Sequence, residues 1–244
     1  RGGNAGRSCP ARADAAPSDT RPPSDRVKPP AGAAPILPTW ADNPGDTLVS
    51  YKANYASNIA RWTAQDALSK PPQNGLLAVG SSSIRYWKDL LLSFSAWKVI
   101  QRGYGGSRIW DTVAHAGKIV TPYRPRAVLV YAGTNDVALG ATPDNVITGY
   151  RCLVQKVRQA LGNVHIAFIG ITPNPARWSQ WSKSVQVNTA IKALATTAPG
   201  LHYIDIPTAF LKTGQPPAKS LFVSDKLHLN VAGYKLWTSV IKPV

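Results

Sequence analysis

The sequence predicts an α/β protein, specifically a three-layer α/β/α sandwich in which helices cover both faces of a five-stranded parallel sheet. Two observations support this prediction: short continuous apolar runs, and stretches of helical period between them. The five apolar runs lie at 76–79, 97–100, 127–132, 166–171 and 203–206. Their length and continuity are typical of strands buried on both faces, so we expect parallel strands joined by right-handed crossovers.

The helices are predicted from apolar residues that recur every three or four positions. In the first pattern Leu48, Tyr55 and Trp62 share one face, and Pro71 and Pro72 end the helix. Further helices are expected at about 109–120, 146–157 and 231–241. Each lies between two apolar runs or after the last one, as crossover helices of a parallel sheet do.

The N-terminal segment differs in composition from the rest of the 244 residues. Residues 1–38 contain eight of the 21 prolines, and before Ile36 only Val27 is a branched aliphatic or aromatic residue. Such a segment buries too little apolar surface to offset its ordering entropy. We therefore predict a disordered, Pro-rich tail or linker at 1–40 and one folded domain at 41–244.

The charge and the cysteines restrict the classes of partner. The formal net charge is +16, from 28 Lys and Arg against 12 acids, all of them Asp. The basic residues are scattered and no nucleic-acid reading motif is present, so we expect no specific nucleic-acid partner, whereas an anionic cell-wall polymer would suit the charge. Cys9 and Cys152 form neither a disulfide framework nor a metal-ligand spacing, and we expect both to be incidental.

Two features bear on location. No apolar run approaches the roughly 20 residues that cross a bilayer, so no membrane span is expected. The chain begins with Arg1 and contains no Met, as a processed secreted protein or a trimmed chain would. We expect a secreted or periplasmic location rather than a cytoplasmic one.

Polar segments follow the predicted strands. They read GSSSIRYW at 80–87, RGYGGS at 102–107, GTND at 133–136 and DKLHLN at 225–230. Each segment alone is explained by a turn or a helix N-cap. In parallel sheets, however, the groups that act on a ligand gather at the carboxyl ends of the strands, and all four segments belong there.

The four segments, in this order, resemble the SGNH (GDSL-like) hydrolase family, in the bacterial branch whose first block reads GSSSIR. The resemblance covers about residues 47–244 and implies the flavodoxin-like fold of that family, ester hydrolysis and no cofactor or metal. It makes Ser82 the nucleophile and Asp225 and His228 its partners. It also makes the backbone N–H groups of Ser82 and Gly106 and the side chain of Asn135 the oxyanion-hole donors. At Ser81 the family pattern has Asp, so the local hydrogen bonding there is expected to differ.

The same chemistry follows from the residue types. A serine hydroxyl is a weak nucleophile and needs a base within hydrogen-bond reach, which a third group orients. Asp225 and His228 are three positions apart, so one short turn presents both side chains together. Glycine at 105 and 106 permits the backbone conformation and close approach that an oxyanion hole requires.

Other enzyme classes are disfavoured by missing motifs. There is no G-x-S-x-G, which disfavours an α/β-hydrolase nucleophile elbow, and no pair of histidines at a ligand spacing such as i, i+4. No Lys-Ser or Lys-Thr follows the glycines at 105 and 106, which disfavours a nucleotide loop. A non-enzymatic polysaccharide-binding module on the same fold remains an alternative.

The substrate is the least determined part of the prediction. We expect a serine esterase that hydrolyses short-chain acyl or aryl carboxylic esters through an acyl-enzyme on Ser82, with a carbohydrate O-acetyl esterase as the alternative. Trp110, Trp178 and Arg177 are candidates for an aromatic and cationic wall that binds the substrate. For the tryptophans the competing explanation is a place in the core, and for Arg177 a solvated surface position.

Overall fold

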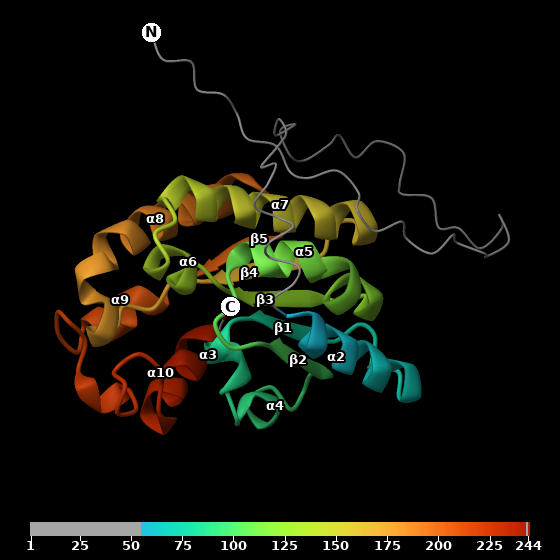
Figure 1. Ribbon diagram of the computed structural model, residues 1–244, viewed down its shortest axis with the longest axis horizontal. Helices are drawn as coiled ribbons and strands as arrows, with labels where there is room; N and C mark the ends of the chain where they lie inside the picture. The colour runs from blue at the N-terminus through green and yellow to red at the C-terminus, as the bar shows by residue number, and fades with distance from the viewer. Residues whose placement is uncertain (1–54, 243) are drawn as a thin grey trace, which may run out of the picture.

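The computed structural model describes residues 55–242 and 244, and within them five parallel strands form one sheet in the order β2-β1-β3-β4-β5 (Figure 1). The strands are β1 Leu76–Gly80, β2 Val99–Gly103, β3 Ala127–Tyr131, β4 His165–Ile169 and β5 Leu201–Ile204. This is the flavodoxin-like order, and the predicted fold class is confirmed. The strand order reverses between β1 and β3, so a crevice at the carboxyl ends of these two strands is the place where such sheets bind ligands.

Helices cover both faces of the sheet. The first face is covered by α2 Ala56–Leu68, α5 Ile109–Ile119, α7 Pro143–Leu161 and α8 Trp181–Thr197. The second face is covered by α3 Ser82–Arg85, α4 Leu90–Ser93, α9 Ile206–Leu211 and α10 Val231–Ile241. The short helix α6 Thr134–Ala138 and the 3₁₀ segments Thr121–Tyr123, Pro175–Gln180 and Lys219–Leu221 lie in the connections.

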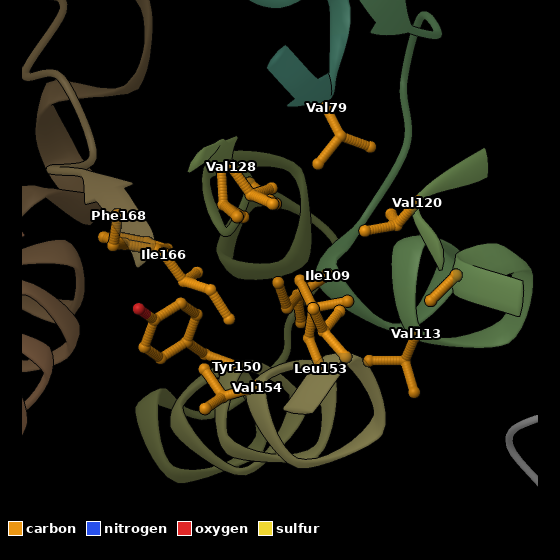
Figure 2. Close-up of a cluster of buried hydrophobic side chains, with 14 of the residues drawn as sticks. Val79, Ile109, Val113, Val120, Val128, Tyr150, Leu153, Val154, Ile166 and Phe168 are labelled. Carbon is orange, nitrogen blue, oxygen red and sulfur yellow. The ribbon is translucent and has the colours of Figure 1, made fainter. Parts of the chain in front are cut away.

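The core consists of two layers because side chains of a strand alternate between the faces of the sheet. In β1, Leu77 and Val79 pack on the first face, while Leu76 and Ala78 pack on the second, and all four are buried. The layer on the first face joins strand residues such as Val79 and Val128 to the apolar sides of α5 and α7 (Figure 2). Burial on both faces explains why β1 reads as a continuous apolar run.

The burial of the strands departs from the prediction. We expected every strand to be buried on both faces, but of the five strands only β1 is buried at every position. The edge strands β2 and β5 contain several half-buried positions, and the inner strands β3 and β4 are less buried at their first residues, Ala127 and His165. The strand β2 also begins two residues later than predicted, at Val99, and Trp97 before it is 40% exposed.

Several predictions concern residues that the structure does not describe. The tail at 1–40, the domain boundary after it and the first turns of the helix expected from Leu48 lie outside the described residues. The described part of that helix, α2, begins at Ala56 and buries Ile59 and Trp62. The expectation that the cysteines are incidental is wrong for Cys152, which is buried in α7 and disulfide-bonded, whereas Cys9 lies outside the described residues.

No helix within the described part of the chain is both long and apolar enough to cross a membrane.

Candidate active site

The carboxyl ends of β1, β2 and β3 are level with one another. Gly80, the last residue of β1, pairs with Gly103 of β2 and with Tyr131 of β3. Two further hydrogen bonds continue this alignment into the loops: Ser81 N–H donates to the Tyr131 carbonyl, and Tyr104 N–H donates to the Gly80 carbonyl, both at 3.0 Å. The three polar segments that follow these strands therefore start side by side.

Ser82, His228 and Asp225 form a chain of hydrogen bonds. The Ser82 Oγ and His228 Nε2 atoms are 2.9 Å apart, and His228 Nδ1 and Asp225 Oδ2 are 2.5 Å apart. Ser82 is the first residue of the short helix α3, directly after β1, and 146 positions separate it from His228. With its Nδ1–H donated to Asp225, the ring presents the lone pair of Nε2 to the serine hydroxyl.

A tight turn holds Asp225 and His228 together. Asp225 Oδ1 accepts the backbone N–H groups of Leu227 and His228, each at 2.9 Å. Val223 N–H donates to the His228 carbonyl, and Lys226 takes a positive φ of 58° to close the turn. Burial raises the pKa of the Asp225 carboxyl, but the hydrogen bonds from His228 and Leu227 outweigh it and hold that pKa below its usual value. Asp225 is therefore ionised beside the imidazole at neutral pH.

Asn135 and Gly106 lie at the adjacent strand ends. Asn135 is 8% exposed, and its Nδ2 donates to the carbonyl of Ser107 at 2.9 Å, so its amide lies against the loop that contains Gly106. Gly106 has φ +78°, a conformation that residues with a Cβ rarely adopt. The next residue of α6, Asp136, accepts the backbone N–H of Ile109 and so fixes the end of the same loop.

Arg177 is bound to the Asn135 side chain rather than solvated. Its Nη1 lies 2.9 Å from Asn135 Oδ1, 3.0 Å from the Thr134 carbonyl and 3.2 Å from Thr134 Oγ1. Asn174 caps this segment by accepting the Arg177 backbone N–H. The alternative of a solvated surface position is therefore wrong. The position of Arg177 after the fourth apolar run indicated that it lies near the site, but nothing in the sequence indicated that it contacts Asn135.

Ser81 stands where the family pattern has Asp, and its environment differs accordingly. Its side chain is fully buried, and its Oγ has no hydrogen-bond partner among the residues described. The backbone of Ser81 instead precedes α3 in an extended conformation and accepts N–H groups of Ile84 and Arg85. The Ser81 hydroxyl is thus separate from the chain that contains Ser82.

Two residues beside this chain were not singled out from the sequence. The Tyr86 ring packs edge-on against the His228 ring, with centroids 5.1 Å apart, and the Arg85 guanidinium lies 5.6 Å from the Tyr86 centroid. Both side chains are exposed. Their place within the segment GSSSIRYW was visible in the sequence, but their contact with a residue 142 positions after Tyr86 was not.

The predicted aromatic wall is only partly accessible. Trp110 is 2% exposed, belongs to the core and donates its Nε1–H to Asn145 Oδ1 at 3.0 Å, so its candidacy as a substrate-binding residue is wrong. Trp178 is half-buried and stacks on Trp181, with centroids 6.2 Å apart and an interplanar angle of 11°. Trp178 follows Arg177 directly and remains a candidate.

The described residues contain no group of three or more His, Cys, Asp or Glu side chains placed to hold a metal ion.

Comparisons with known proteins agree with this architecture. The model of the GDSL-like lipase/acylhydrolase family matches residues 71–236. A GDSL-like lipase from Bacteroides thetaiotaomicron has a TM-score of 0.63 and 19% identity, over 77% of this chain and 96% of its own. A lipase/acylhydrolase from Enterococcus faecalis has a TM-score of 0.57 and 18% identity, over 68% and 92%.

An acetylxylan esterase from Geobacillus stearothermophilus also has a similar structure, with a TM-score of 0.58 and 16% identity over 70% of this chain and 94% of its own. No curated protein matches the sequence. At such identities the solved structures show a shared fold, while the family model covers more than half of the chain. The chain belongs to the GDSL-like lipase/acylhydrolase family.

Proposed function

We propose that this protein is a serine esterase that hydrolyses short-chain carboxylic esters through an acyl-enzyme on Ser82. The observation that supports the proposal most directly is the chain of contacts from Ser82 Oγ through His228 to Asp225. It supplies a nucleophile, a base and a group that orients the base, as acyl transfer to serine requires.

The first half of the reaction forms the acyl-enzyme. His228 Nε2 takes the proton of Ser82 while Oγ bonds to the ester carbonyl carbon and the carbonyl oxygen becomes an oxyanion. The backbone N–H groups of Ser82 and Gly106 and the Asn135 Nδ2 stabilise that oxyanion. The bond from carbon to the alcohol oxygen then breaks, and His228 returns the proton to the leaving alkoxide.

The second half regenerates the serine. Water gives a proton to His228 and bonds to the acyl carbon, forming a second oxyanion in the same site. The bond to Ser82 Oγ breaks, Oγ recovers the proton from His228, and the carboxylic acid leaves. Asp225 remains ionised throughout and stabilises the imidazolium that exists between the proton transfers.

Labelling tests the choice of nucleophile among three adjacent serines. An organophosphate or sulfonyl fluoride should modify Ser82, as read by mass spectrometry of the peptide. The Ser82→Ala variant should neither be labelled nor hydrolyse 4-nitrophenyl acetate, whereas Ser83→Ala is the matched control and should keep most of its activity. An adduct on Ser81 or Ser83 overturns the assignment. Folded wild-type protein that hydrolyses no ester favours the non-enzymatic polysaccharide-binding module.

A panel of 4-nitrophenyl esters tests the acyl preference. Each methylene of an acyl chain gains about 0.8 kcal/mol only if it is buried in an apolar channel. The Tyr86 ring, which packs against His228, is amphipathic, and the side chains of Asn135 and Arg177 at the adjacent strand ends are polar and charged. We expect kcat/KM to be highest for acetyl to butyryl esters and to fall beyond about six carbons. A steady rise to dodecanoyl, measured below micelle-forming concentrations, would contradict a short-acyl site.

A carbohydrate O-acetyl esterase is the second candidate, and the stacked pair of Trp178 and Trp181 favours it. Aromatic faces bind the apolar faces of sugar rings, and this pair directly follows Arg177, which contacts Asn135. Under this candidate, Trp178→Ala should raise KM for an acetylated oligosaccharide while leaving kcat/KM for 4-nitrophenyl acetate within about twofold. Equal losses on both substrates would assign Trp178 to the scaffold.

We also infer that the protein functions in an oxidising compartment, outside the cytoplasm. The support is the disulfide bond of Cys152, since such bonds persist mainly in secreted and periplasmic proteins. Intact mass of protein isolated from its natural source and alkylated without reduction should show no modified cysteine. Alkylation of Cys152 in that sample would contradict the inference.

A further inference from the structure

Two exposed cations, which form no ion pair with the residues that the structure describes, lie close in the chain to Ser82 and His228. Arg85 ends the short helix α3, one turn after Ser82, and Lys226 lies in the turn between Asp225 and His228. Both side chains are exposed, and neither forms an ion pair with any residue between 55 and 242.

Arg85 reaches across the site rather than away from it. A Cβ built on Gly105 would lie 3.5 Å from Arg85 Nη1, so the guanidinium stands against the loop that contains Gly106. The same guanidinium lies over the Tyr86 ring, which packs against His228. The Tyr86 ring therefore lies between the Arg85 guanidinium and the His228 imidazole.

The acidic groups near the site do not neutralise these cations. Asp225 is engaged by His228 and by two backbone N–H groups. Asp111 and Asp136 are buried, and Asp111 pairs with Arg108. Arg177 adds a further positive charge beside Asn135. The charge that faces a substrate is therefore predominantly positive, which favours an anionic ligand.

The position of both cations with respect to His228 indicates which part of the ester is anionic. Lys226 lies in the turn between Asp225 and His228, and the Arg85 guanidinium lies over the Tyr86 ring, which packs against His228. In the proposed mechanism His228 gives its proton to the leaving alcohol, so the alcohol lies on the His228 side of the scissile bond. An anion on that alcohol would approach Arg85 and Lys226.

We propose that the site selects esters in which a small acyl group is carried by an anionic alcohol, such as an acidic glycan, with Arg85 and Lys226 binding the anion. This inference rests on the proposed esterase function and specifies its substrate class. The anion would bind through charge attraction to the two cations at a solvated surface. This attraction raises kcat/KM mainly through substrate binding, and salt weakens it.

Two matched acetate esters test the proposal: 4-acetoxybenzoate, with a carboxylate on the leaving phenol, and the neutral 4-acetoxybenzamide. The measured quantity is the ratio of kcat/KM for the anionic ester to that for the neutral ester, in the full-length protein. Any loss of folded protein affects both esters equally and cancels in this ratio. Comparing variants with the wild type also cancels the different intrinsic reactivities of the esters.

In Arg85→Gln/Lys226→Gln at low salt we expect the ratio to fall about tenfold below the wild-type ratio. High salt should lower the wild-type ratio toward that of the double variant. The control is Lys118→Gln, which removes one charge from the last turn of α5 and should leave the ratio unchanged.

A second pair of esters tests whether the two cations bind an anion on the acyl group instead of one on the alcohol. The acyl group is anionic in mono-4-nitrophenyl succinate and neutral in 4-nitrophenyl butyrate, and we expect their ratio to change less than twofold in the double variant. A tenfold change in this pair instead would put the anion on the acyl side and overturn the proposal. An unchanged ratio in the acetoxy pair overturns it while the esterase function stands, and absence of hydrolysis of all four esters overturns both.

Discussion

Histidines lie both at the carboxyl ends of the strands, here called the carboxyl edge of the sheet, and at their amino ends, here called the amino edge. The partners of these histidines differ between the two edges. At the carboxyl edge, His228 lies between the Asp225 carboxylate and the Ser82 hydroxyl. At the amino edge, His165 and His202 contact each other, with ring nitrogens 2.9 Å apart and rings inclined by 22°. A hydrogen bond between two imidazoles orients no base toward a nucleophile. The neighbours of a histidine therefore decide whether it can activate a serine.

The carboxyl and amino edges also differ in polarity. A cavity of about 560 Å³ at the amino edge has an apolar lining that includes Leu76, Phe94 and Leu129, with Arg126 and Lys242 among its charged residues. At the carboxyl edge, polar groups such as Asn135 and Arg177 are bonded to one another. Preorganised polar groups suit a site that stabilises developing charge, whereas an apolar cavity far from Ser82 does not.

The largest expected effect separates the histidines of the two edges. His228→Ala should lower kcat for 4-nitrophenyl acetate by about 10⁴ or more, because the serine loses its base. His202→Ala removes an imidazole from the amino edge and should leave kcat within about twofold. Steady-state kinetics of the two variants, each checked for folding by circular dichroism, decide the comparison. Similar losses in both would mean that the edges are not functionally distinct.

The proposed oxyanion-hole donor at the carboxyl edge, Asn135, should have the next largest effect. Asn135→Ala removes the Nδ2 donor, and we expect kcat to fall by about 10² to 10³ with a smaller change in KM. The interaction is made mainly in the transition state, which is why kcat changes more than KM. An unchanged kcat would remove Asn135 from the proposed oxyanion hole.

Arg177 should act through Asn135 and therefore have a smaller effect. Its Nη1 holds the Asn135 Oδ1, so Arg177→Gln should lower kcat about tenfold and leave KM for a neutral ester nearly unchanged. In the Asn135→Ala background the same substitution should have little further effect, because the group that it positions is gone. Fully multiplicative effects of the two substitutions would make Arg177 independent of Asn135.

Asn135 and Arg177 show which features of the site could be predicted from the sequence and which could not. Asn135 was predictable because it follows a buried strand, and parallel strands bring their carboxyl ends to one edge. The contact of Arg177 with Asn135 was not predictable, since it joins residues 42 positions apart through one side-chain conformation. That five strands exist was predictable from the five apolar runs, but their ends and their half-buried positions were not, since these depend on which elements pack against each strand. For Trp110 a place in the core was the more common explanation and a place in the site the alternative, and only packing decides between them.

The smallest expected effects are on stability, and they have opposite signs at the two edges. Burial raises the pKa of Asp136, at the carboxyl edge, to about 7, although the N–H of Ile109 partly offsets it. Burial, and then the nearby His165 and Arg158, lower the pKa of His202 at the amino edge. Folded protein therefore binds more protons than unfolded protein at Asp136 and fewer at His202.

At Asp136 the folded state loses stability as pH rises from the unfolded pKa near 4 to about 7, so the Tm of Asp136→Asn should rise against the wild type between pH 5 and 8, by about 5 to 10 °C. At His202 stability is lost as pH falls below about 6.5, so the Tm of His202→Asn should rise against the wild type as pH falls from 7 to 5, by about 1 °C.

The measurement is Tm by scanning calorimetry in buffers of equal ionic strength. Because Asn keeps an acceptor for Ile109 N–H, the first variant changes the charge more than the hydrogen bond. Tm differences that change with pH in the same direction for both variants would show that burial of these two groups does not control the pH response of the two edges.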